Sequence, residues 1–370
     1  MVTSLLEDLY VGTKIHVSAL DSHKLLDEIN QAGIVAQTVN LMREKAQFEN
    51  LPVDLWGELV LRHQRIVEQS LFIHHYHELI CSTLEAAQLP VIPLKGILYA
   101  ERFYGHFAAR GTSDIDLLVR ECDVARVVKL LRNLGFQGPS RFNPIHFHCV
   151  MWKSIPSVKS TMLNVEIHWS LMHRGLSNLD IEMFWADSTP RTHFTYIREL
   201  SIQHTFYATC LHGVNHKMDS LKYSLDIAHL LYRFGHQINL QTLLAQAKRD
   251  KTYNRVCTVL AKVYQQFPSL HRFKPLSQAV LKLRLPCDWV LHHPLLLVDS
   301  WGYRAQLIKS IVWPQVEVAL WHMRDDPTVN LKNVYFKFYY RRMSRVLKRV
   351  SLTKRNRGGR SLGRVMDTDR

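Results

Sequence analysis

The stretch KGILYAERFYGHFAARGTSDIDLLV, residues 95–119, carries the features that decide the fold prediction. It opens with a Lys-Gly turn, continues as a short helix and a basic polar loop, and ends in a strand that starts with two carboxylates. Side chains two residues apart share one face of a strand, so Asp114 and Asp116 point the same way, while Ile115 and Leu117 point into a core. Two acids on one face indicate a cation site.

The segments on either side fit a strand flanked by helices. An apolar run at residues 91–94 predicts a short strand before Lys95-Gly96. A strand, a tight turn and a helix can aim backbone N–H groups at a phosphate, and glycine lets the backbone approach closely. After the acids, an apolar stripe predicts a helix that starts near Asp123 and stops at Gly135.

A third acid comes from a later strand. Residues 146–152 and 161–169 predict two strands, expected to be antiparallel neighbours. In the second strand, alternation puts Glu166 and His168 on a polar face, opposite an apolar one. Glu166 is therefore the candidate that would complete a set of three carboxylates.

Three carboxylates on an open sheet suit two-metal nucleotidyl transfer. In that chemistry one ion activates the attacking hydroxyl and the other holds the triphosphate. Magnesium prefers carboxylate oxygens, water and substrate phosphates. An Asp-x-Asp by itself is expected about once by chance in a chain of this length, and a second one, at residues 367–369, has no strand around it and receives no role. The context of Asp114, Asp116 and Glu166 carries the prediction of metal ligands.

The rest of the chain predicts helices around this core. The fold prediction is α+β, with a small mixed β-sheet flanked by N- and C-terminal helical regions. The expected parts are a helical region at 1–88, an α/β core at 89–200, a second helical region at 201–330, and a basic, partly disordered tail at 331–370. In the longest predicted helix, starting at Asp54, apolar residues recur at helical spacing to about residue 87.

Histidines elsewhere are weaker metal candidates. His212 and His216 lie four apart on one predicted helix face, but Gly213 stands where a zinc peptidase motif needs its glutamate. The cluster at residues 74–77 would need ligands from elsewhere in the chain. Packed or solvated histidines are the favoured interpretation of both groups.

Charge and composition limit the class of protein. The chain has 370 residues, is 47% hydrophobic and carries a formal net charge of +15. Residues 332–370 contain 13 Lys and Arg against two acids, so the basicity belongs mainly to the tail. Six unclustered cysteines, no signal-peptide pattern and no long apolar segment predict a cytoplasmic protein.

These residues resemble a known family. The motifs are Leu94-Lys95-Gly96, Arg110, the Ser113–Val119 run, and Val165-Glu166-Ile167-His168-Trp169. They are similar to those of a largely uncharacterised bacterial nucleotidyltransferase family, related to the minimal and aminoglycoside-type enzymes of the polymerase-beta-like fold. The likeness covers roughly residues 30–235. This sequence differs from the wider superfamily in the turn that precedes the acids, and it has Glu166 at a position where Asp is usual.

The resemblance implies an activity and roles for the residues. The protein would move a nucleoside monophosphate from an NTP to a hydroxyl-bearing acceptor, with Mg²⁺, or Mn²⁺ in its place, held by Asp114, Asp116 and Glu166. Lys95 and Arg110 would meet the triphosphate. Either Lys95-Gly96 or the Arg110–Ser113 segment would form the phosphate turn. The simplest role for Ser113 is to cap the turn before the acids. His168 would support Glu166 or touch substrate, or else pack as an ordinary strand residue.

Two other classes of function stay open. A binding module for nucleotide or protein could keep this fold without the reaction, and the Glu at the third acid position is the feature that suggests it. The basic tail could contact nucleic acid or an anionic membrane, although a solvated extension is the favoured interpretation. The sequence names neither the acceptor, nor the preferred NTP, nor the oligomeric state.

Overall fold

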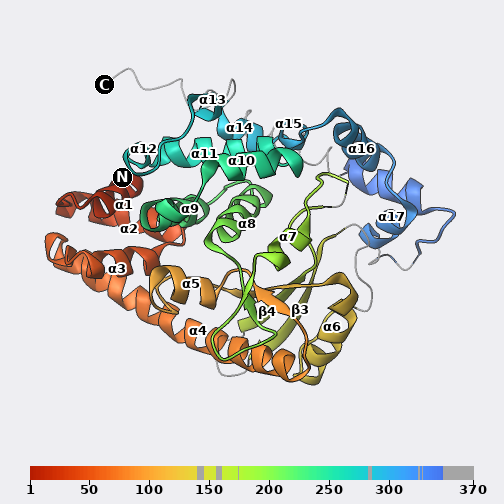
Figure 1. Ribbon diagram of the computed structural model, residues 1–370, viewed down its shortest axis with the longest axis horizontal. Coiled ribbons are helices and arrows are strands. Elements are labelled where there is room, and N and C mark those ends of the chain that lie inside the picture. Colours follow the sequence, from red (N-terminus) through yellow and green to blue (C-terminus); the bar gives the residue numbers. More distant parts are fainter. Residues whose placement is uncertain are drawn as a thin grey trace, which may run out of the picture. The chain divides into compact units, whose positions relative to one another are not determined.

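The computed structural model describes residues 1–139, 146–155, 161–173, 175–281, 286–323, 326 and 328–344 (Figure 1). The chain divides into two compact units, one of residues 1–142 and 146–307, the other of residues 143–145 and 308–370. The first unit contains the sheet. The predicted four-part division stays a prediction, and the predicted disorder at the end of the tail falls outside the described residues.

A four-stranded mixed sheet forms the centre of the first unit, in the order β1-β2-β4-β3. Strand β2 pairs antiparallel with β1 and parallel with β4, and β4 pairs antiparallel with β3. The α+β prediction is therefore confirmed, as is the antiparallel pairing of the two later strands. The strands span Val91–Pro93 (β1), Asp114–Val119 (β2), His148–Ile155 (β3) and Thr161–His168 (β4), and a separate hairpin joins Thr189–Pro190 (β5) to Arg198–Glu199 (β6).

One face of the sheet is largely apolar and packs on two helices. Ile115, Leu117 and Val119 of β2 join Val165 and Ile167 of β4 in a buried cluster with residues of α4 (Val53–Ala86) and α6 (Val124–Asn133). Helix α6 ends where Gly135 takes a φ of 84°, as predicted from its glycine. Helix α4 begins just after Pro52, and Asp54 lies in its first turn. A carboxylate at that position stabilises the helix by interacting with the positive end of its dipole.

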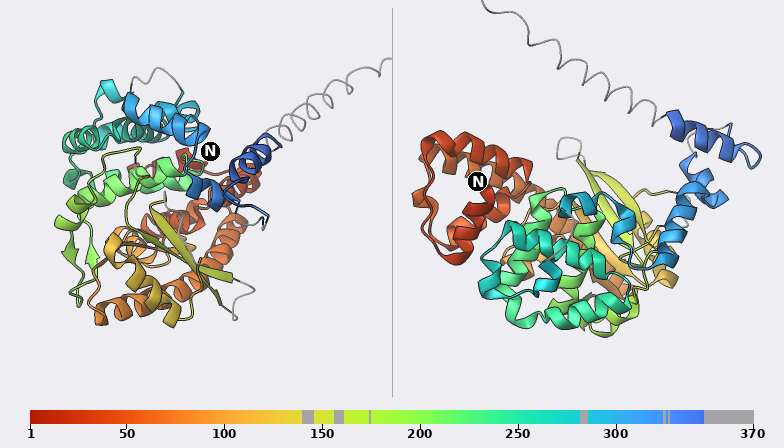
Figure 2. Two further views of the ribbon diagram at one scale, coloured as in Figure 1. Left: turned by 90° about the vertical axis from the view of Figure 1, so that its right-hand side faces the viewer. Right: turned by 90° about the horizontal axis from the view of Figure 1, so that it is seen from above.

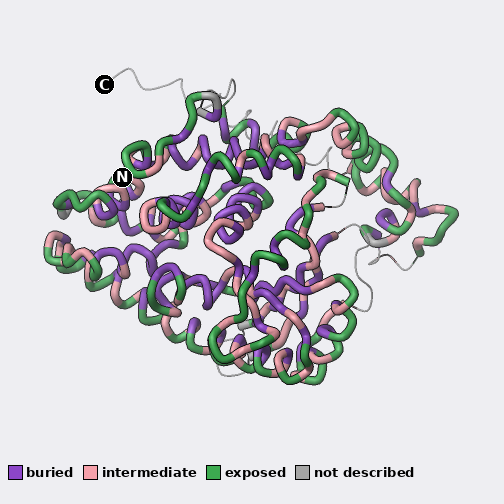
Figure 3. The backbone as a smooth tube through the Cα atoms, in the orientation of Figure 1, coloured by how far each residue is buried: buried purple, intermediate pink, exposed green. Residues whose placement is uncertain are grey.

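The opposite face of the sheet meets the helices that precede and follow the core. Ile92 and Leu118 share a second, larger buried cluster with α5 (Ile97–Tyr104), α8 (Ile202–Asn215) and α9 (Leu221–Phe234). Figure 3 shows the largely buried course of α8 and the strands. Because the polar residues of β2 and β4 lie on this face, they are enclosed between the sheet and the C-terminal helices.

The other helices of the first unit extend this second cluster. Helices α1–α3, drawn in red, lie at the end of the unit away from the sheet (Figures 1 and 2). Among the described residues, no helix is long and apolar enough to cross a membrane. The remaining helices of the first unit are α1 Val2–Val11, α2 Ser22–Gln31, α3 Val35–Glu44, α7 Ile181–Ala186, α10 Leu240–Arg249, α11 Tyr253–Gln266, α12 Leu270–Phe273, α13 Gln278–Leu281, α14 Cys287–Leu291 and α15 Pro294–Leu297. Helix α16, Trp301–Val312, runs into the second unit, which also contains α17, Val316–His322, and a helix at residues 334–344.

Candidate active site

The three predicted carboxylates lie on one face of two neighbouring strands. The parallel register of β2 and β4 sets Asp116 opposite Glu166 and Asp114 opposite Asn164. Asp116 is buried, with 2% of its surface exposed, whereas Asp114 and Glu166 are half-buried. Pairing between strands that are distant in sequence thus brings together the acids that alternation alone placed on the polar faces.

His168 joins Asp116 and Glu166 directly. Its Nε2 lies 3.2 Å from Asp116 Oδ1 and 3.3 Å from Glu166 Oε2. One ligand atom from each of the three residues lies within 4.8 Å of the others, a spacing that a single metal ion could bridge. The sequence prediction had given His168 only a supporting or substrate-contacting role. Its place two residues after Glu166 was the signal that could have made it a ligand candidate.

Lys95-Gly96 lies beside the acids in space, although it is far upstream in sequence. The Leu94 N–H donates to the Asp116 carbonyl at 3.0 Å, which carries the chain alongside β2. Gly96 has a φ of 78°, and a Cβ there would come within 3.2 Å of the Asp114 carbonyl oxygen. Only glycine combines that conformation with so close an approach. The turn therefore holds Lys95 against the carboxylates.

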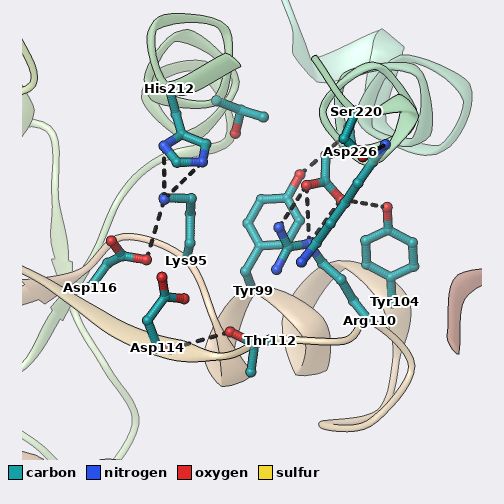
Figure 4. Close-up of polar contacts among 12 residues, drawn as sticks. Lys95, Tyr99, Tyr104, Arg110, Thr112, Asp114, Asp116, His212, Ser220 and Asp226 are labelled. Atoms are coloured by element: carbon teal, nitrogen blue, oxygen red, sulfur yellow. Dashed lines mark hydrogen bonds and ion pairs between the residues drawn. The ribbon is translucent and has the colours of Figure 1, made fainter. Parts of the chain in front are cut away.

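Lys95 links the sheet to helix α8. Its ammonium lies 3.3 Å from Asp116 Oδ2 and 2.9 Å from His212 Nδ1 (Figure 4). Burial and then the Lys95 charge lower the pKa of His212 well below its usual value, so the neutral ring accepts a hydrogen bond from the ammonium. His212, which the sequence presented as half of a weak zinc motif, thus orients Lys95.

Arg110 is engaged with a partner that the sequence did not reveal. Its Nε donates to Asp226 Oδ1 at 2.9 Å, and its Nη2 donates to Oδ2 at 2.7 Å. The Tyr104 hydroxyl also donates to Oδ1, at 2.9 Å (Figure 4). Both charged groups are buried. This bidentate pair fastens α9 to the loop before β2, and the predicted contact of Arg110 with a triphosphate stays a prediction.

Ser113 is exposed at the start of β2. The side-chain hydrogen bond at this turn comes from its neighbour Thr112, whose hydroxyl donates to the Asp114 carbonyl at 3.2 Å. Thr112 therefore contacts the strand backbone at Asp114, while Lys95 lies between Asp116 and His212 of α8 (Figure 4).

The carboxylates have divergent acidities. Burial and then the charge of Asp116 raise the pKa of Asp114. Burial also acts to raise the pKa of Asp116, but Lys95 and His168 outweigh it and bring the value well below the usual range. A hydrogen bond from His168 lowers the pKa of Glu166. Against the effect of burial, these same bonds raise the pKa of His168, which favours an imidazolium between the two acids.

Lys222 is a site residue that the sequence prediction missed. Ser220 caps α9 by accepting the backbone N–H of Lys222, and Lys222 lies one turn before Asp226 on the same helix. Burial, followed by repulsion from Arg110, lowers the pKa of its ammonium to about 8, and Asp114 is among the acids that act on it. Within the described part of the chain the ammonium makes no hydrogen bond or ion pair.

The donor set fits a divalent cation. Asp116, Glu166 and His168 offer two carboxylates and an imidazole within bridging distance, and His168 Nδ1 is buried without a hydrogen-bond partner. Asp114 adds a carboxylate whose pKa is raised by burial and then by the charge of Asp116, and a bound cation would relieve the second of these effects. In this state Lys95 places a positive charge beside Asp116, and His168 adds a second one when it is protonated.

The fold and the site are compatible with a protein of the nucleotidyltransferase class. The model of a family described as uncharacterised nucleotidyltransferase matches residues 18–266, and the chain belongs to that family. The resemblance that the sequence motifs suggested is thereby confirmed. No curated protein and no solved structure matches the chain.

Proposed function

We propose that this protein is a Mg²⁺-dependent nucleotidyltransferase that moves a nucleoside monophosphate from an NTP to a hydroxyl-bearing acceptor and releases pyrophosphate. The observation that carries the proposal is the cross-strand set of Asp116, Glu166 and His168 beside Lys95. Membership in a nucleotidyltransferase family supports the same chemistry.

Asp116, Glu166 and His168 would hold one ion, and Asp114 is the carboxylate available to a second. When bound, such ions stabilise the charge that develops on the phosphates and acidify the acceptor hydroxyl. Mn²⁺ has similar ligand preferences and would substitute. Because His168 is favoured as an imidazolium in this state, metal binding there would release its proton.

The chain's own residues would position the two substrates. Lys95, oriented by His212, and Lys222, at the start of α9, present ammonium groups on the carboxylate side of the sheet and would contact the triphosphate. Glu166 is ionised and half-buried, so one of its oxygens can accept a hydrogen bond from the acceptor hydroxyl and orient it for attack. Arg110 would act through Asp226 by fixing α9, rather than through the substrate.

Nucleotide transfer from an α-labelled NTP to candidate sugar, small-molecule and peptide acceptors tests this proposal. We expect the Asp114→Asn/Asp116→Asn variant to lose at least about a thousandfold in rate, because the charge that holds the ions is removed. Asp54→Asn, at an exposed carboxylate on α4, is the matched control and should keep full activity. Equal turnover by the double variant and the wild type would refute the proposal.

A binding module without catalysis is the second candidate, because His168 already bridges the two acids with a favoured positive charge. Calorimetry with a non-hydrolysable NTP analogue separates the two. Binding that is equally tight in Mg²⁺ and in a chelator would favour the module, whereas strong dependence on Mg²⁺ supports the enzyme.

A further inference from the structure

Exposed apolar side chains gather in the described part of the second unit. Of the 21 large hydrophobic residues that are exposed among the described residues, eight lie between positions 308 and 344. This share is out of proportion to so short a segment. The eight are Ile308, Ile311, Val312, Trp313, Leu331, Phe336, Tyr340 and Met343.

The last described helix, residues 334–344, has one covered and one uncovered face. Val334 is fully buried, and the neighbouring Tyr335 stacks on Trp313 and donates its hydroxyl to the Pro314 carbonyl at 2.9 Å. On another face Phe336, Tyr340 and Met343 are 75%, 70% and 59% exposed. Their spacing of four and three residues aligns them in a single stripe along the helix.

The charge around this stripe is positive. Lys337, Arg341 and Arg342 lie on the same helix, where Lys337 pairs with Asp326 and the two arginines donate to the carbonyls of His322 and Ile311. Residues 332–370 together carry 13 Lys and Arg against two acids. A helix that combines an aromatic stripe with flanking Lys and Arg is typical of segments that lie in the interface of an anionic membrane, with the stripe at the boundary between headgroups and acyl chains.

We propose that residues 334–344 form an interfacial helix that docks the protein onto an anionic lipid surface. The stripe would enter the headgroup region, and the net positive charge of residues 332–370 would attract the anionic lipid phosphates. A nucleic acid would satisfy the cations but would leave the aliphatic Met343 in water, so the lipid is the occupant that accounts for both halves of the surface. This inference is independent of the proposed transferase activity, and it places the protein at a membrane surface.

Co-sedimentation of the full-length protein with vesicles tests the inference. We expect binding to vesicles of equal parts phosphatidylcholine and phosphatidylglycerol, at least about tenfold weaker binding to pure phosphatidylcholine, and weakening at high salt. The Phe336→Ser/Tyr340→Ser/Met343→Ser variant should lose at least about tenfold in binding to the anionic vesicles. These side chains are exposed, so circular dichroism should show an unchanged fold.

Leu61→Ser/Leu71→Ser is the matched control, because both leucines are exposed on α4 in the first unit, and it should bind vesicles like the wild type. Equal vesicle binding by the triple variant and the wild type would overturn the proposal. So would binding of single-stranded RNA in preference to vesicles, or a dimer that the triple variant abolishes while no vesicle is bound.

Discussion

At the scale of single residues, the site is defined by which charges have partners. Asp116 has Lys95 and His168, Glu166 has His168, and Asp226 has Arg110. Lys222 is the contrasting case, a half-buried ammonium with no partner in the described part of the chain. A buried charge without a partner lowers stability, and such groups are typical of positions that wait for a ligand.

Replacing this lysine should therefore raise stability and lower function. In Lys222→Met, we expect the free energy of unfolding at pH 7 to rise by about 1 kcal/mol, because a half-buried charge without a partner is removed, and NTP binding to weaken at least about tenfold. Above pH 8 the free energy of unfolding of the wild type should rise relative to that of the variant. There the folded lysine loses its proton, at a pKa of about 8, while the unfolded one keeps its proton up to about 10.4.

Urea unfolding at neutral and alkaline pH, with calorimetry of an NTP analogue, measures both effects. Lys129→Met, at an exposed lysine on α6, is the control and should change neither quantity. A Lys222→Met protein that is less stable at pH 7 and binds NTP normally would show that the ammonium has only a structural role.

At the scale of elements, the turn between β1 and α5 is the part most tightly specified by its sequence. Gly96 holds a left-handed φ and lies against the Asp114 carbonyl. The Leu94 N–H is bonded to the Asp116 carbonyl. The turn therefore fixes the place of Lys95 through the backbone of β2, so its geometry and that of the acids are coupled.

Gly96→Ala should disturb both stability and transfer. We expect a loss of about 1–2 kcal/mol in the free energy of unfolding from the left-handed conformation, and reduced activity because a Cβ would press on Asp114. Gly57→Ala, in the interior of α4 with no atom near the new Cβ, should instead stabilise the protein by about 0.5–1 kcal/mol. Chemical denaturation of the two variants gives the comparison, and a similar change in both would contradict it.

Much of the local structure could be predicted from the sequence, because local periodicity determines it. The alternation in β2 and β4 placed Asp114, Asp116 and Glu166 on their polar faces, and helical spacing located α4 and α6. The long-range partnerships could not be predicted. Arg110 and Asp226 are 116 residues apart, and Lys95 and His212 are 117 apart. No periodic pattern encodes such pairs, since they arise only when the helices pack onto the sheet.

At the scale of the whole molecule, the site and the family match lie in the first unit. The match ends at residue 266, whereas the second unit consists of residues 143–145 and 308–370. Every site residue discussed above lies between Lys95 and Asp226, and the two main hydrophobic clusters end at Leu297. The chemistry and the proposed lipid contact therefore belong to separate parts of the chain.

Deleting residues 331–370 should separate the two activities. We expect nucleotide transfer and the unfolding transition of the first unit to stay within about twofold and a few degrees of the wild type, because a unit with its own core folds by itself. Binding to anionic vesicles should be lost. Parallel transfer, thermal-unfolding and co-sedimentation assays measure the three properties. A joint loss of transfer and vesicle binding would contradict this independence.

Lys95 contacts both Asp116 of β2 and His212 of α8, and this limits how early the site can assemble while the chain grows on the ribosome. A nascent chain that ends near residue 200 already contains Asp114, Asp116 and Glu166, but it lacks both His212 and Asp226. Lys95 therefore lacks His212, and Arg110 lacks Asp226, until α8 and α9 have been synthesised. Completion of the site coincides with the docking of these two helices, so a truncated translation product would carry all three acids without the contacts that arrange the cations around them.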